Sequence, residues 1–278
     1  MNLHKSKATL FFPATSQAKL GNTKYLCIAA HQDDIELMAA GAILECYETN
    51  AFTGVVVTDG AGSPRTGIYA NCSDEDMKRI RANEQNNAAS VGCYNAQFQL
   101  YYASSEVKDN ANQKLVDELA EIILATSPEV VLTHNFADKH DTHVAVATRT
   151  LQALRKIPPE KRPRVVYSME VWRALDWVAD EDKTLFNTSH DEFLQAALLG
   201  VFHSQIAGGK RYDLAGLGRK RANATYFASH ATDDYDAAEY ALDITELMNN
   251  PELSPAEFIT EHIEKFKADV NKRLGMFI

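Results

Sequence analysis

Short apolar runs alternate with helical stretches from Lys24 to Met169, and this alternation predicts the fold. Strands are expected in five of these runs, at residues 24–30, 54–58, 97–102, 130–133 and 164–169. Helices are expected between them, at residues 37–47, 74–91, 113–125 and 141–155. Strands that are apolar almost throughout are typical of a parallel sheet covered on both faces. Because crossovers between parallel strands are right-handed, the pattern predicts an α/β fold with a Rossmann-like, doubly wound, mostly parallel sheet.

The pattern changes after Trp172. Residues 173–278 predict a largely helical C-terminal portion, with a glycine-rich stretch at residues 206–223 in its middle. Neither an internal repeat nor a linker-like composition divides the chain. We therefore expect residues 1–278 to form a single domain, in which residues 1–22 are an N-terminal extension.

Charge and cysteine content narrow the possible partners. The chain has 28 basic and 38 acidic residues, a formal net charge of −10, which disfavours nucleic acid and anionic membranes. The four cysteines form no C-x-x-C pair, and free thiols are typical of a reducing compartment. No signal peptide or run of membrane-spanning length is evident. We expect a cytoplasmic protein without membrane insertion that acts on a small polar molecule.

Histidines and carboxylates follow two of the predicted strands at the edge of the sheet where ligands bind in such folds. The first strand is followed by His31, Asp33 and Asp34, and the strand at 130–133 by His134, His140 and His143. His31, Asp34 and His143 can together supply the three ligands of a catalytic zinc site, and Asp33 can accept a proton from water. The alternatives are a helix cap for the aspartates and an ordinary polar helix face for the histidines.

These residues lie in motifs that resemble those of a known family. AAHQDDIELMAAGAI resembles the A-H-P-D-D-x-E motif of the LmbE-like, or PIG-L, deacetylase family, which includes deacetylases of the bacillithiol and mycothiol pathways. VTDGAGS, RANEQNNAASVGCY and THNFADKHDTHVAVATRTL resemble three further motifs, the last of them H-P-D-H. The resemblance implies a zinc-dependent hydrolase, with Fe²⁺ as another possible metal, that removes an N-acetyl group from a glucosamine-type conjugate. It also implies a homo-oligomer.

The resemblance implies a role for each matching residue. His31, Asp34 and His143 would be the zinc ligands, and Asp33 the general base. His140 would stabilise the oxyanion or protonate the departing amine. The family's proline is Gln32 here, and the aspartate of H-P-D-H is Thr142. Loss of that carboxylate would weaken His140 as an acid unless Asp138 or Asp141 replaces it.

Two further residues are candidates for binding substrate. Arg81 matches a family arginine and could hold a substrate carboxylate or hydroxyls, or it could simply pair with Glu84 on the same helix. His203 could reach the site from the C-terminal half, although a lone histidine in a helical segment is usually ordinary.

Three other functions remain open. The same machinery could act as an amidase on a larger conjugate. A metal-binding but inactive relative could serve as a binding module, for which Thr142 is the only support. A nucleotide-binding protein on a Rossmann-like sheet would need a glycine-rich fingerprint after the first strand, where this chain has HQDDIE.

Overall fold

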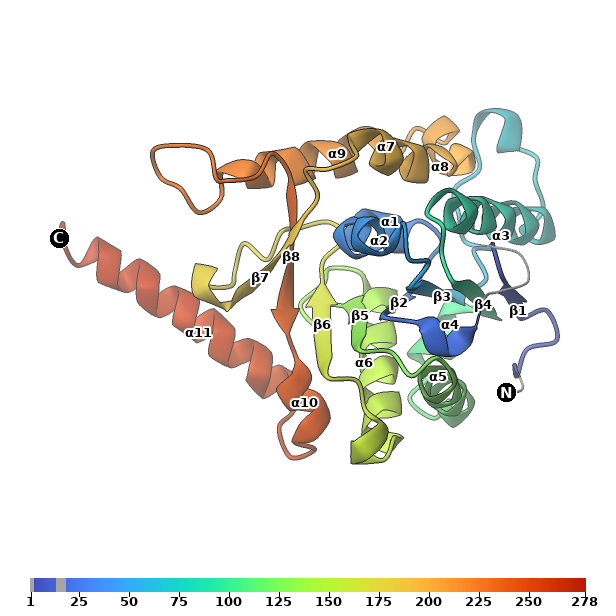
Figure 1. The fold of residues 1–278 in the computed structure, drawn as a ribbon, viewed down its shortest axis with the longest axis horizontal. Helices are drawn as coiled ribbons and strands as arrows, with labels where there is room; N and C mark the ends of the chain where they lie inside the picture. The colour runs from blue at the N-terminus through green and yellow to red at the C-terminus, as the bar shows by residue number, and fades with distance from the viewer. Residues whose placement is uncertain (1–2, 14–18) are drawn as a thin grey trace.

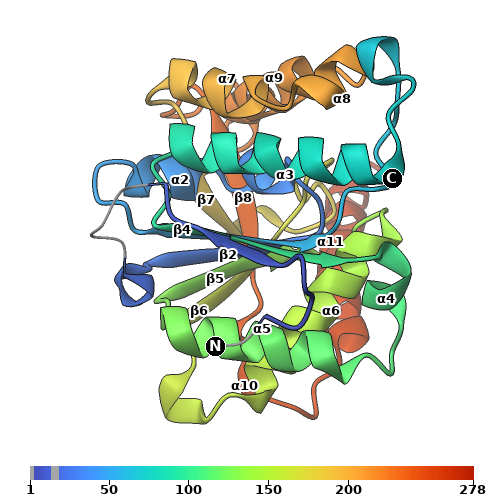
Figure 2. The ribbon, with the colours of Figure 1, turned by 90° about the vertical axis from the view of Figure 1, so that its right-hand side faces the viewer.

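A computed structural model describes residues 3–13 and 19–278 and shows one mixed sheet between layers of helices (Figures 1 and 2). The strands are β1 Thr9–Phe11, β2 Tyr25–Ala29, β3 Phe52–Thr58, β4 Ala96–Tyr102, β5 Val130–His134, β6 Val165–Met169, β7 Lys183–Asn187 and β8 Ala238–Asp243. The helices are α1 Asp34–Met38, α2 Ala40–Cys46, α3 Asp74–Val91, α4 Ser104–Lys108, α5 Gln113–Thr126, α6 Asp141–Lys156, α7 Glu192–Gly200, α8 His203–Ala207, α9 Tyr212–Ala222, α10 Thr245–Asn249 and α11 Pro255–Leu274.

The sheet confirms the predicted α/β class. Its strand order is β1-β4-β3-β2-β5-β6-β8-β7, and the five strands from β4 to β6 are parallel. The chain runs outward from β2 to β3 and β4 on one side and continues with β5 and β6 on the other. This reversal next to β2 is a topological switch point, where such folds bind ligands.

The edges of the sheet are antiparallel and come from the two ends of the chain. β1, which lies in the predicted N-terminal extension, pairs with β4. β8 pairs with both β6 and β7, so the C-terminal portion contributes two strands as well as five helices. Sequence analysis anticipated the helices there but not these strands. They attach residues 173–278 to the same sheet as the first half of the chain.

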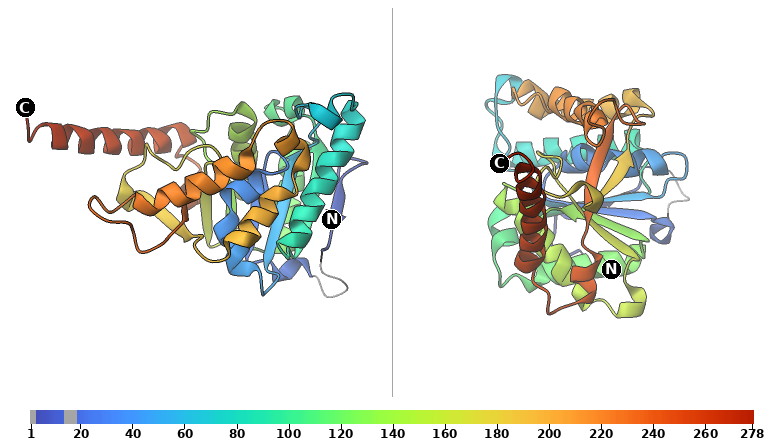
Figure 3. Two further views of the ribbon diagram at one scale, coloured as in Figure 1. Left: turned by 90° about the horizontal axis from the view of Figure 1, so that it is seen from above. Right: turned by 90° about the vertical axis from the view of Figure 1, so that its left-hand side faces the viewer.

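Helices cover both faces of the sheet, and alternate residues of β2 point to opposite sides. Leu26 and Ile28 pack toward α5 and α6, whereas Cys27 packs toward α1, α2 and α7. The helices α7, α8 and α9 form an outer layer above α3 (Figures 2 and 3). Among the described residues, no helix combines the length and the apolar character that a membrane crossing requires.

A buried ion pair joins the outer layer to the helices that follow β2. Lys220 of α9 lies 2.7 Å from Glu239 of β8, and both side chains are almost fully buried. Glu239 accepts hydrogen bonds from the backbone N–H groups of Ala40 and Gly41 at the start of α2. Lys220 donates to the carbonyl oxygen of Leu37 near the end of α1. The C-terminal portion therefore fixes the short helices that position Asp34.

Candidate metal centre and active site

The loop after β2 places two consecutive aspartates at the start of α1. Asp33 adopts a φ of 92°, a left-handed conformation that costs free energy for a residue with a side chain. Its backbone N–H donates to Gln85 Oε1 of α3. One residue later, Asp34 Oδ2 accepts the backbone N–H of His31 at 2.8 Å. This strained turn allows the two carboxylates to point in different directions.

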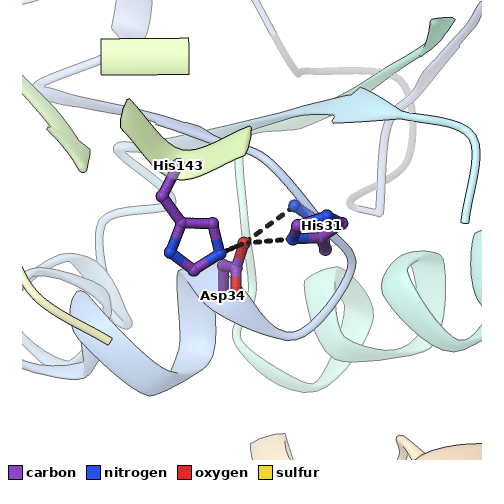
Figure 4. Close-up of side chains that lie close together, drawn as sticks. All are labelled: His31, Asp34 and His143. Atoms are coloured by element: carbon purple, nitrogen blue, oxygen red, sulfur yellow. Dashed lines mark hydrogen bonds and ion pairs between the residues drawn. The ribbon is translucent and has the colours of Figure 1, made fainter. Parts of the chain in front are cut away.

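Asp34 lies at the centre of a histidine cluster (Figure 4). Its Oδ2 is 3.2 Å from His31 Nδ1 and 3.3 Å from His143 Nε2. These ligand atoms of His31, Asp34 and His143 lie within 4.8 Å of one another. Two imidazoles and one carboxylate are a donor set that zinc prefers, and they leave a coordination position open. The structure thus brings together the three residues predicted as ligands, and their donor atoms fit one metal ion.

Asp138 fixes the orientation of His143. Asp138 Oδ2 lies 3.0 Å from His143 Nδ1, and both side chains are buried. Burial opposes protonation of His143, but Asp34 and Asp138 outweigh it and raise its pKa to about 10. When Nδ1–H donates to Asp138, the lone pair of Nε2 is free to bind a metal. Sequence analysis considered Asp138 only as a partner for His140.

His134 is the residue that sequence analysis noted without assigning it a role. It ends β5, its Nε2 lies 3.4 Å from Asp34 Oδ2, and its ring stacks on His143 with centroids 4.0 Å apart. Nε2 accepts the backbone N–H of Ala30, and within the described chain Nδ1 is buried without a partner. Burial and the neighbouring His143 lower the pKa of His134 to about 4. A neutral His134 therefore forms one wall of the cluster.

Asp33 points to the other side, toward α3. Arg81 donates to Asp33 Oδ2 at 2.9 Å and to the carbonyl oxygen of Gln32. Burial raises the pKa of Asp33 to about 6, an effect that Arg81 opposes and Asp34 reinforces. Arg81 also forms the predicted ion pair with Glu84, at 2.7 Å. Its guanidinium lines the cavity but is directed at Asp33.

His140 precedes α6 at the mouth of the site. Its Nδ1 accepts the backbone N–H of Thr142 at 3.3 Å, so the neutral ring carries its proton on Nε2. Within residues 3–13 and 19–278, no carboxylate oxygen is hydrogen-bonded to the His140 ring. Burial and the nearby His143 and His31 lower its pKa. At neutral pH, His140 is therefore a hydrogen-bond donor without a charge.

These residues line one cavity of about 440 Å³ at the switch point. Besides His31, Asp33, Asp34, Arg81, His140 and His143, its walls include Asp59, Ser63, Lys108, Trp172, Gln205, Lys210 and Tyr212. Trp172 and Tyr212 pack together with ring centroids 4.7 Å apart. Trp172 and Tyr212, the latter from the C-terminal portion, thus form an aromatic wall of the cavity.

Glu84 attaches the outer helical layer to this cavity. It accepts hydrogen bonds from the backbone N–H and the hydroxyl of Ser204, at 2.6 and 2.8 Å. The next residue, Gln205, reaches the cavity. The described residues that line the cavity do not include His203. Its Nδ1 instead lies 2.8 Å from the Tyr69 hydroxyl on the exposed side of α8.

Comparison with known proteins finds a family match in the first part of the chain. Residues 26–154 match the sequence model of the PIG-L family, described as GlcNAc-PI de-N-acetylase. The matched range contains His31, Asp33, Asp34, Arg81 and His143. The match confirms the resemblance of these motifs to the PIG-L, or LmbE-like, family. No curated protein sequence matches the chain significantly.

Three solved structures share the fold. A conserved protein of Thermus thermophilus has a TM-score of 0.63 and 19% identity over 80% of this chain and 94% of its own. The 4-carboxy-2-hydroxymuconate hydratase of Pseudomonas putida has a TM-score of 0.62 and 19% identity, over 80% and 96%. The N,N'-diacetylchitobiose deacetylase of Pyrococcus horikoshii has a TM-score of 0.62 and 15% identity, over 82% and 86%. Because a hydratase and a deacetylase both share it, the fold does not define the reaction.

Proposed function

We propose that this protein is a zinc-dependent hydrolase that removes an N-acetyl group from a glucosamine-type conjugate. The observation that carries the proposal is the convergence of His31, Asp34 and His143 beside Asp33 in one cavity. The family match over residues 26–154 and the deacetylases among the proteins of the same fold support it. The substrate is a small soluble conjugate met in the cytoplasm, in keeping with the acidic net charge of −10.

A zinc ion held by His31, Asp34 and His143 would polarise the amide carbonyl and lower the pKa of water. Asp33 lies next to that ligand set without belonging to it, and Arg81 holds its carboxylate in place. It therefore accepts the proton of the attacking water and delivers it to the departing amine nitrogen. His140, with its proton on Nε2, donates a hydrogen bond to the developing oxyanion.

The aromatic wall and the outer helices bind the substrate. Trp172 and Tyr212 offer apolar faces against which a sugar ring can stack. Arg81 acts on substrate chiefly through Asp33, since its guanidinium donates to Asp33, Gln32 and Glu84. His203, if it binds substrate, does so outside the cavity, at the edge formed with Tyr69.

Metal content and product analysis test this proposal together. The purified protein should hold about one zinc ion per chain, His143→Ala should lose it, and His203→Ala should keep it. Acetate should be released from a panel of N-acetylglucosaminides. A larger acid from a larger conjugate would instead identify an amidase, and metal retention without turnover of any amide would identify a binding module. A native protein that binds no metal would overturn the ligand assignment.

A further inference from the structure

The C-terminal helix α11 has an apolar stripe that the other described residues leave largely exposed. The helix is well formed, because Ser254 and Glu257 make a capping box at its start and Pro255 occupies its first turn. It extends away from the sheet as an arm (Figures 1 and 3). Only Phe258 is buried. His262 and Lys265 hold the helix to Asp182, at 3.2 and 2.8 Å.

The apolar side chains along α11 from Ile259 onward follow a helical repeat, and all of them except Ile259 are exposed. Ile259, Ile263, Phe266, Val270 and Leu274 are spaced by three or four residues. At 100° per residue they occupy an arc of about 80°, which is the seam of a helix that packs on another helix. Ile259 packs against the core, and the stripe continues from there to the uncovered tip. Of the fifteen large apolar residues exposed in the described chain, seven lie between Ile263 and Ile278.

The charges along α11 are distributed asymmetrically. Its first half, residues 255–264, carries three glutamates and no lysine or arginine. Its second half, residues 265–274, carries four basic residues and one acidic residue. Two such helices side by side attract when antiparallel and repel when parallel, and their macrodipoles favour the same orientation. The charges of one arm are therefore complementary to those of a second arm in the antiparallel orientation.

A groove of mixed charge lies beside the arm. A cavity of about 250 Å³ opens next to Phe266 and Val270, and its opposite wall carries Asp176, Asp180, Glu181 and Lys183, of which Lys183 pairs with Asp180. In an antiparallel pair centred on Phe266, the partner's basic second half lies instead alongside the glutamates in the first half of α11. A membrane surface fits less well, since the three glutamates and the net charge of −10 disfavour anionic lipid.

We propose that α11 pairs antiparallel with α11 of a second copy of this chain, with Phe266 near the two-fold axis. The pairing buries the apolar stripe of both arms and forms an isologous interface. Ile263 of one copy then lies beside Val270 of the other. No residue of α11 lines the candidate active-site cavity, and the pairing does not depend on the proposed function.

Molar mass in solution tests the pairing. By light scattering and analytical ultracentrifugation, the full chain should form species with an even number of copies. Phe266→Glu with Val270→Glu should raise the dissociation constant on the order of a hundredfold, since both residues are central and fully covered in the pair. Asn271→Glu, which adds a charge on the polar face, should leave the mass unchanged. A native monomer, or a double variant that keeps its mass, would overturn the proposal.

Cysteine cross-linking tests the orientation, in a background where Cys72 and Cys93 are replaced by serine. Phe266→Cys should form a disulfide between copies under mild oxidation. Leu274→Cys should not, because eight residues on either side of the axis separate the two sulfurs by about 24 Å, beyond disulfide reach. Cross-linking at both positions would indicate a parallel pair. Cosedimentation of monomeric protein with phosphatidylcholine–phosphatidylglycerol vesicles would assign the stripe to lipid. A parallel pair or a lipid-bound monomer would each refute the proposal.

Discussion

The buried ion pair between Lys220 and Glu239 predicts how much the contact between α9 and β8 contributes to the stability of the protein. The two side chains are 4% and 7% exposed, and the Lys220 ammonium also donates to Leu37. Lys220→Met leaves the Glu239 carboxylate buried without a counter-charge, a change that typically costs about 3–5 kcal/mol. Because the N–H groups of Ala40 and Gly41 still donate to Glu239, we expect the lower end, about 3 kcal/mol.

Urea unfolding in the presence of a chelator measures this loss without a contribution from bound metal. A melting temperature lower by about 6–12 °C should accompany it in a domain of this size. Arg219→Met, an exposed neighbour on α9, should change stability by less than about 0.5 kcal/mol. Adding Glu239→Gln to Lys220→Met should recover part of the loss, because the unpaired buried charge is removed, although the single amide oxygen can accept from only one of the two N–H groups of α2. A loss below about 1 kcal/mol, or no recovery in the double variant, would refute this account of the pair.

Two further predictions concern the metal centre. Asp138→Ala should weaken zinc binding about 10- to 100-fold in a competition titration, because His143 loses the carboxylate that orients it, whereas the exposed Asp141→Ala should bind zinc normally. Equal zinc affinities of these two variants would show that Asp138 does not support zinc binding. Asp33→Asn should keep stoichiometric zinc but lose about 10²- to 10⁴-fold in kcat, because the amide cannot accept a proton. Loss of the metal together with activity would instead make Asp33 a ligand.

Local signals made part of this structure predictable. The helix predicted at residues 74–91 has those bounds in the structure, because Ser73 and Asp76 cap its start and Gly92 follows its end. The parallel strands were visible as apolar runs, and the polar residues after them marked the ligand-binding edge. His31, Asp34 and His143 could be selected because they follow two strands and lie in family motifs.

The remaining features depend on pairings between distant residues. β8 was missed because it is held by antiparallel pairing with β6 and β7, which no local pattern reveals. The role of His134 depends on the register of β5 beside β2, which pairs Ile28 with Thr133. The contact between Glu84 and Ser204, which brings α8 to the cavity, joins residues 120 positions apart. Such contacts form only when the whole sheet and its outer layer are assembled.

Thr142 shows how structure changes the meaning of a departure from a motif. From the sequence, the missing aspartate weakens His140 as an acid, and Asp138 is one of two possible replacements. In the structure, Asp138 instead contacts the ring of the candidate ligand His143, and the backbone of Thr142 donates to His140. The carboxylate that a ligand histidine requires is therefore present, while His140 stays neutral. On the proposed mechanism, the substitution thus affects the protonation of His140, which would face the oxyanion, and leaves the candidate ligands His31, Asp34 and His143 in place. We therefore expect the protein to retain metal binding with Thr142 at this position, and its activity to depend less on a protonated acid group.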